Sequence, residues 1–291
     1  MKQFRCLMAV ILIMSLFASC GSSQTTESNE QGSKILATTY PMYYLTSHLT
    51  EGIENITVDV MVSEAVSCLH DYTLTTEQMK KIERADLIVM NGMGLEEFMT
   101  SALESVPEEK IFTAAISEDH VLRTDTGELD PHYWLNPDRY LEALQSVAEK
   151  LVEQYPVQEQ LIIENEAKLE EKLKELSGSL KSLEVSCQEM ITFHDGFSYF
   201  ADGCGLTILA AIEEEEGAEA SAAELKEICN LIEQYQIPAI FVEKNGSTNA
   251  AEIIARETGV QVYTLNMIMD GQTDYITAME ENIRTVEEAL S

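Results

Sequence analysis

The stretch that decides the fold carries no strand signal: PVQEQLIIENEAKLEEKLKELSGSLKSL, from Pro156 to Leu183. Pro156 suits the first position of a helix. The apolar residues that follow recur with helical spacing: Ile162, Leu169, Leu173, Leu176, Leu180 and Leu183. A helix from Pro156 to about Gly178 would be about 35 Å long, which is the length of a domain. We therefore predict one stiff connecting helix. The alternative, a coiled-coil seam between two copies, is weaker because the repeat does not persist over several heptads.

Apolar segments rich in strand-forming residues lie on both sides of this helix. KILATTY, ITVDVMV, DLIVMNG and KIFTAA precede it, and EMITFH, LTILAAI, PAIFVE and VQVYTL follow it. Helical segments separate the members of each set, which predicts an α/β fold of two lobes, each with a mainly parallel sheet flanked by helices. The expected bounds are 35–155 for the N-terminal lobe, 156–183 for the long connecting helix and 184–291 for the C-terminal lobe.

The N-terminus has the order of a secretory signal. Lys2 and Arg5 precede an apolar run, and small residues precede Cys20. The ending LFASC resembles the lipobox of bacterial lipoproteins, which implies that Cys20 is lipidated. We expect a signal peptide at 1–19 and a lipidated, flexible polar tether at 20–34. The alternative is an ordinary signal peptide that is cleaved elsewhere.

The charge and the cysteines limit the function further. The formal net charge is −33, and loss of residues 1–19 removes two basic residues and no acidic one, which makes it −35. Such acidity argues against nucleic acid as a partner. Beyond Cys20, the chain holds Cys68, Cys187, Cys204 and Cys229, without CxxC zinc spacing or a dense disulfide framework. One disulfide in the C-terminal half is possible, and the sequence does not determine which two cysteines would form it.

Three histidines follow strands or precede helices. His70 lies in SCLHDYTLTTEQ, His132 in DPHYWLNP and His194 in ITFHDGFSYF. Ligands of α/β lobes gather at the carboxyl ends of strands, so the shared placement predicts a site that uses all three. Pro131 and the two aromatic rings after His132 restrict that imidazole, which favours a ligand. The alternative is a packed histidine beside a helix start that Asn136 or Asp138 caps.

Four segments together resemble one known family: HDYTLTTEQMKKIERADLIVMNGMGLEEF, DPHYWLNPDRY, FHDGFSYFADGCGL and PAIFVEKNGSTNAAEIIARETGVQV. The chain from Ile35 to Leu290 looks like a metal-binding, substrate-binding lipoprotein of a bacterial ABC importer, from the zinc and manganese receptor family. The resemblance implies a metal cleft between the lobes. It also implies ligands at His70 and His132 from the N-terminal lobe and at His194 from the C-terminal lobe.

The fourth ligand departs from the family pattern. Family members often place a carboxylate where this chain has Met269, and Asp270 follows one residue later. Asp270 is our predicted fourth ligand. Water that completes a three-histidine site is the alternative, and Glu243 is expected to orient the site or to replace Asp270. Cys68 matches no family ligand. Imidazole at His194 favours zinc, with manganese or iron as the alternative, because carboxylate oxygen suits manganese better.

The expected function is an extracytoplasmic, high-affinity metal receptor, anchored to the bacterial cell membrane by its lipid, that delivers zinc to an ABC permease. The expected partners are the permease with its ATPase, the metal ion and the membrane, and the receptor is expected to be a monomer. No HExxH motif occurs, and a carboxylate ligand would close the open position that a hydrolytic zinc enzyme needs, so we do not expect an enzyme. A surface-exposed adhesin lipoprotein is the remaining alternative.

Overall fold

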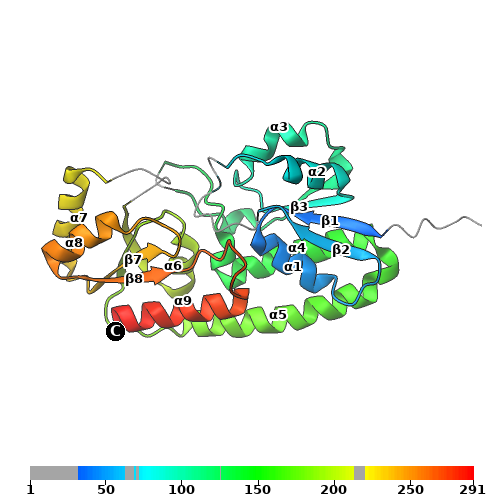
Figure 1. The fold of residues 1–291 in the computed structure, drawn as a ribbon. Helices are drawn as coiled ribbons and strands as arrows, with labels where there is room; N and C mark the ends of the chain where they lie inside the picture. Colours follow the sequence, from blue (N-terminus) through cyan, green and yellow to red (C-terminus); the bar gives the residue numbers. More distant parts are fainter. Residues whose placement is uncertain (1–31, 63–68, 70–71, 125, 213–219) are drawn as a thin grey trace, which may run out of the picture. The chain divides into compact units, whose positions relative to one another are not determined.

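The structure is a computed structural model that describes residues 32–62, 69, 72–124, 126–212 and 220–291. Its residues form two four-stranded parallel sheets with helices packed around them (Figure 1). No helix among these ranges has the length and apolar character that a membrane crossing requires. The predicted signal peptide, Cys20, the tether up to residue 31 and Cys68 lie outside the described residues.

The N-terminal sheet has the strand order β2-β1-β3-β4. Its strands are β1 (Ser33–Ala37), β2 (Ile56–Val60), β3 (Leu87–Met90) and β4 (Ile111–Thr113). Its helices are α1 (Tyr40–Leu49), α2 (Thr76–Arg84) and α3 (Thr100–Leu103). Residues 35–37 of the central strand β1 and residues 87–89 of the central strand β3 are buried and apolar, as expected of a parallel sheet covered on both faces.

The C-terminal sheet repeats this plan with the order β6-β5-β7-β8. Its strands are β5 (Glu189–Thr192), β6 (Thr207–Ala211), β7 (Ala239–Glu243) and β8 (Gln261–Leu265). Its helices are α6 (Ser198–Cys204), α7 (Ala222–Tyr235), α8 (Asn249–Thr258) and α9 (Tyr275–Leu290). Each of the eight predicted strand segments overlaps one observed strand, and only β1 extends beyond its segment, by one residue at Ser33.

Helices α4 (Pro137–Gln154) and α5 (Glu159–Lys181) connect the two sheets. Pro156 opens a short 3-10 turn, Pro156–Gln158, from which α5 continues for 23 residues, or about 35 Å. The predicted stripe is buried from Ile162 to Leu180. Helix α5 contacts α1 of the first lobe and both α6 and α9 of the second, so it runs along both lobes (Figure 1). The predicted fold class, including the long rigid helix, is confirmed.

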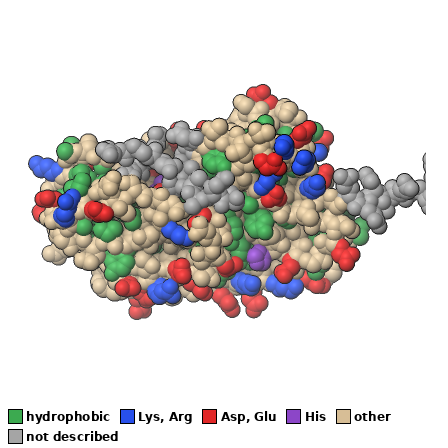
Figure 2. Space-filling model, in the orientation of Figure 1, with side chains coloured by type: hydrophobic (Ala, Val, Ile, Leu, Met, Phe, Trp, Pro, Cys, Tyr) green, Lys and Arg blue, Asp and Glu red, His purple; other side chains and the backbone are tan. Residues whose placement is uncertain are grey.

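The surface is mainly acidic, with basic side chains interspersed. Figure 2 shows Asp and Glu side chains along the lower edge of this face, over α5 and α9. Lysines pair with several of them, as Lys174 does with Glu170 at 2.5 Å, but these are exposed pairs of small energetic weight. These pairs do not offset the net charge of −33, and this excess of negative charge favours the approach of cations.

Candidate metal site

His132 lies in the loop that leads into α4, and a buried carboxylate fixes its ring. Asp130 Oδ1 accepts hydrogen bonds from the His132 backbone N–H at 2.9 Å and from Nδ1 at 2.8 Å. The Asp130 side chain is 1% exposed and that of His132 is 12% exposed. A hydrogen bond donated by Nδ1 leaves Nε2 as the nitrogen with a lone pair for a metal. The expected cap also forms, because Asn136 Oδ1 accepts the N–H of Asp138 at 3.0 Å.

The loop after β3 is hydrogen-bonded to the loop of His132 and helps to hold it in place. Asn91 Nδ2 donates to the carbonyl of Pro131 at 3.0 Å. Asn91 is in turn held by Glu96, whose buried carboxylate accepts the Asn91 N–H at 2.6 Å and the Thr38 hydroxyl at 2.6 Å. Burial raises the pKa of the Glu96 carboxyl, and these hydrogen bonds oppose part of the rise. Residues at the ends of β1 and β3, where the strand order reverses, thus set the position of His132.

His194 follows β5 by two residues and is 7% exposed. Its ring centroid is 5.3 Å from that of His132, and the two ring planes are almost perpendicular at 85°. Thr192 Oγ1 donates to the His194 carbonyl at 3.0 Å, which fixes the backbone at the strand end. Gly196 makes room for the ring, because a Cβ there would lie 2.6 Å from His194 Cδ2. Imidazoles from the two lobes therefore meet at one place.

Glu243 and Asp270 come from neighbouring parts of the C-terminal lobe. Glu243 is the last residue of β7, the strand beside β5, and is 9% exposed. Asp270 lies in the loop between β8 and α9, and its Oδ2 is 3.4 Å from Lys244 Nζ. Its Oδ1 accepts the N–H of Gln272 at 3.0 Å. Asp270 remains a predicted metal ligand. Glu243 remains a residue that is predicted to orient the site or to replace Asp270.

His70 lies outside the described residues. Leu69 before it is fully buried, and Tyr72 after it donates its N–H to the Leu69 carbonyl at 3.1 Å. The described residues include four of the predicted site residues, His132, His194, Glu243 and Asp270, yet they contain no group of three or more His, Cys, Asp or Glu side chains arranged to hold a metal. The described part of the site is the pair His132 and His194 with the Asp130 carboxylate behind it.

The other two histidines have partners of their own. His48 Nδ1 is 2.8 Å from the Tyr44 carbonyl, and His120 Nδ1 is 2.7 Å from Glu142 Oε1. Both are partly exposed. Neither forms a ring contact with another histidine among the described residues.

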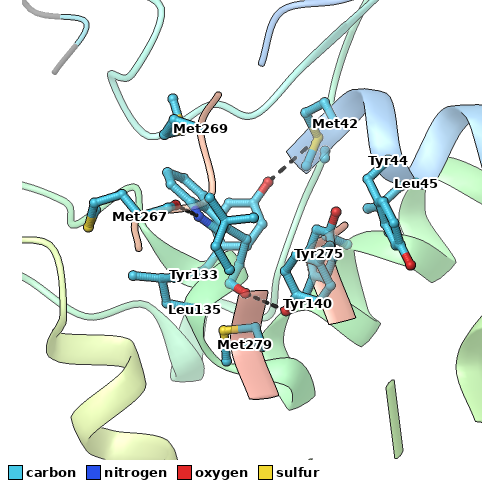
Figure 3. Packing of buried hydrophobic residues seen from close by; sticks show 14 of the residues in the cluster. Met42, Tyr44, Leu45, Tyr133, Leu135, Tyr140, Met267, Met269, Tyr275 and Met279 are labelled. Carbon is cyan, nitrogen blue, oxygen red and sulfur yellow. Dashed lines mark hydrogen bonds between the residues drawn. The ribbon is translucent and has the colours of Figure 1, made fainter. Parts of the chain in front are cut away.

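A buried aromatic cluster joins the lobes next to His132. Trp134, two residues after that histidine, donates its indole N–H to the Met267 carbonyl of the C-terminal lobe at 2.8 Å. Tyr275, the first residue of α9, donates its hydroxyl to the Trp134 carbonyl at 2.6 Å and packs on Tyr140 of α4 at 4.5 Å between centroids. Figure 3 shows Met267 on one side of this cluster and Met42 of α1 on the other. The loop of His132 is therefore anchored in both lobes.

Three structural roles were missed at the sequence level. The sequence does not identify Asp130 as the hydrogen-bond partner of His132, and the spacing Asp-Pro-His is the local signal that could have found it. Two further contacts join segments that are far apart in sequence, so no local pattern predicts them. They are the hydrogen bond from Trp134 to Met267 and the contact of Lys244 with Asp270. The sequence allowed one disulfide in the C-terminal half. No disulfide forms among the described cysteines, because Cys187, Cys204 and Cys229 are all free thiols.

Known proteins resemble this chain over most of its length. A protein of Streptococcus pyogenes named zinc-binding protein AdcA is 26% identical over 315 residues, which cover 95% of this chain and 60% of that protein. The chain thus spans about 60% of the length of such relatives. The high-affinity zinc uptake system protein ZnuA of Bacillus subtilis is 26% identical, with 99% of this chain and 98% of that protein covered.

Solved structures share the fold. The zinc-bound ZnuA-like domain of AdcA from Streptococcus pneumoniae superposes with a TM-score of 0.75 at 26% identity, covering 89% of this chain and 99% of that one. The family model described as zinc-uptake complex component A, periplasmic, matches residues 35–289. That match takes in both sheets, the connecting helix and the loops of both histidines, and the chain therefore belongs to the family of periplasmic zinc-uptake components.

Proposed function

We propose that this chain is the extracytoplasmic zinc receptor of an ABC importer, and that it carries the ion between its lobes. The observation that carries the proposal is the meeting of His132 and His194, from different lobes, with ring centroids 5.3 Å apart. Membership of the zinc-uptake family supports zinc as the ion. Imidazole ligands also suit zinc, and manganese or iron is the alternative cargo.

The proposed ligand set is His70, His132, His194 and Asp270. Four ligands of this kind would close a tetrahedral site, which suits binding and leaves no open position for a hydrolytic water. Asp130 would orient His132 and increase the basicity of its ring, as carboxylates behind metal-bound histidines do. Glu243, buried at the end of β7, would act from behind the site or replace Asp270.

Zinc should stabilise the folded protein if the ligands come from both lobes. A ligand at 100 times its Kd adds about 2.7 kcal/mol to the free energy of unfolding, which raises the Tm of a domain of this size by about 5 to 10 °C. We expect this rise in chelator-treated protein after zinc is added, and its loss in His132→Ala and in His194→Ala. His48→Ala is the matched control, because its ring binds the Tyr44 carbonyl. Equal zinc responses in all four proteins would refute the proposal.

The lipid anchor is a separate part of the proposal. We propose that residues 1–19 are removed, that Cys20 is lipidated, and that a monomeric receptor works beside its permease and ATPase at the membrane. The positively charged start, the apolar run and the LFASC ending support this. Fatty-acid labelling in cells should mark the wild type and not Cys20→Ala. Equal labelling of the two proteins would refute the proposed lipid anchor and would not bear on the proposed metal site.

A further inference from the structure

A lysine lies on the carboxylate that is predicted to complete the site. Lys244 Nζ is 3.4 Å from Asp270 Oδ2, and the two side chains differ sharply in exposure, at 35% for the lysine and 2% for the aspartate. The ammonium can therefore withdraw into water, while the carboxylate stays in place. Such a pair has one fixed partner and one that can leave.

The backbone around Asp270 accounts for its fixed position. Asp270 Oδ1 accepts the N–H of Gln272, which closes a tight turn on the carboxylate itself. Gly271 has a φ of +62°, and a Cβ on it would meet the ring of Tyr40 at 2.6 Å, so only glycine fits there. Upstream, Asn282 holds Asn266 through two hydrogen bonds of 2.8 Å. The loop is thus fastened on both sides of Asp270.

The sheet fixes the origin of the lysine side chain. Lys244 directly follows β7, and its N–H donates to the Leu265 carbonyl at the end of β8, at 2.9 Å. This hydrogen bond continues the register in which Glu243 pairs with Leu265. The Lys244 backbone therefore stays beside the start of the Asp270 loop, and only the flexible lysine chain has to move for its ammonium to leave the carboxylate.

The chemistry of the carboxylate makes lysine and metal competitors. A buried carboxylate without a cation is costly, so Asp270 is stabilised by the ammonium. Zinc at the same oxygen would place a divalent ion against that ammonium, and the two cations repel each other at such a distance. Zinc and the ammonium therefore compete for Oδ2, the oxygen that the lysine approaches.

We propose that Lys244 sets the affinity of the site, because its ammonium is an internal cation that zinc has to displace from Asp270. The inference rests on the proposed function and adds an affinity-determining residue to it. Removing the ammonium while keeping the length of the side chain, as in Lys244→Met, should tighten zinc binding about three- to tenfold. Lys244→Arg keeps a cation and should bind zinc close to the wild-type affinity.

A double-mutant cycle separates direct competition from a general effect of charge. The Kd of zinc is measured by calorimetry against a competing chelator for wild type, Lys244→Met, Asp270→Asn and the double variant. We expect Asp270→Asn to weaken binding, and Lys244→Met to have no effect in the Asp270→Asn background. A long-range effect of the positive charge would persist in that background and would overturn the inference.

Two further results would overturn it. An unchanged or weaker affinity in Lys244→Met would mean that the lysine does not compete, and an unchanged affinity in Asp270→Asn would mean that the carboxylate is no ligand. Melting curves recorded without zinc verify that each variant is folded. If His132→Ala still loses zinc binding in the same assay, the receptor function stands after either result. An unchanged affinity in Asp270→Asn would also remove Asp270 from the proposed ligand set.

Discussion

Asp130→Asn tests whether the carboxylate behind His132 contributes to zinc binding. Asp130 Oδ1 accepts both the backbone N–H and the Nδ1 of His132, and an asparagine keeps an oxygen that can do the same. The substitution therefore removes charge and leaves the hydrogen bonds. Hydrogen bonds to charged groups contribute about 1.5 to 3 kcal/mol, against about 0.5 to 1.5 for neutral ones. The expected loss is about 1.4 kcal/mol, which is about tenfold in Kd.

The assay is a zinc titration against a chelator of known affinity, with the Tm of each protein recorded first. Glu142→Gln is the matched control, because Glu142 Oε1 accepts from the ring of His120, which is not a proposed ligand, at 2.7 Å. We expect Asp130→Asn to raise the Kd and Glu142→Gln to leave it unchanged. A wild-type Kd in Asp130→Asn, or an equal shift in both variants, would refute the argument.

Three smaller predictions concern packing and reactivity. Gly196→Ala should weaken zinc binding, because its Cβ would lie 2.6 Å from the His194 ring, whereas Gly178→Ala, with nothing within 4 Å, should leave the Kd unchanged in the same titration. Trp134→Phe loses its 2.8 Å hydrogen bond to the other lobe and should lower the free energy of unfolding by about 1 to 3 kcal/mol, measured with urea. Burial raises the pKa of the Cys204 thiol to about 11, so alkylation at pH 8, followed by mass spectrometry, should be about tenfold slower in folded than in urea-unfolded protein. Each prediction would be contradicted by its own result: unchanged zinc affinity in Gly196→Ala, unchanged stability in Trp134→Phe, or equal alkylation rates in folded and unfolded protein.

Local patterns were sufficient to predict the architecture. Each strand is a short apolar run with its own boundaries, and the stripe from Ile162 to Leu180 has a helical period that is visible without tertiary information. The placement of His194 at a strand end also followed from the strand itself. These features depend on residues close together in the chain, which is the reason that the sequence was enough.

The contacts that complete the site depend on distant residues. Lys244 and Asp270 are 26 positions apart, and Trp134 and Met267 are 133 apart. Their partnership arises only when β7 lies beside β8 and when the second lobe packs against the start of α4. Asp130 is close to His132 in sequence, but an Asp-Pro-His motif is compatible with a turn as well as with a hydrogen bond to the ring. Whether Met269 or Asp270 takes the family's carboxylate position depends likewise on the fold of the loop after β8, which the local sequence does not determine.

The most direct test of the account is the position of zinc itself. Crystals grown with zinc and measured at its absorption edge should give one strong anomalous peak between the lobes. The account predicts ring nitrogens of His70, His132 and His194 at about 2.0 to 2.1 Å from that peak. A peak bound by histidines of one lobe alone, or no peak beside His132 and His194, would contradict it.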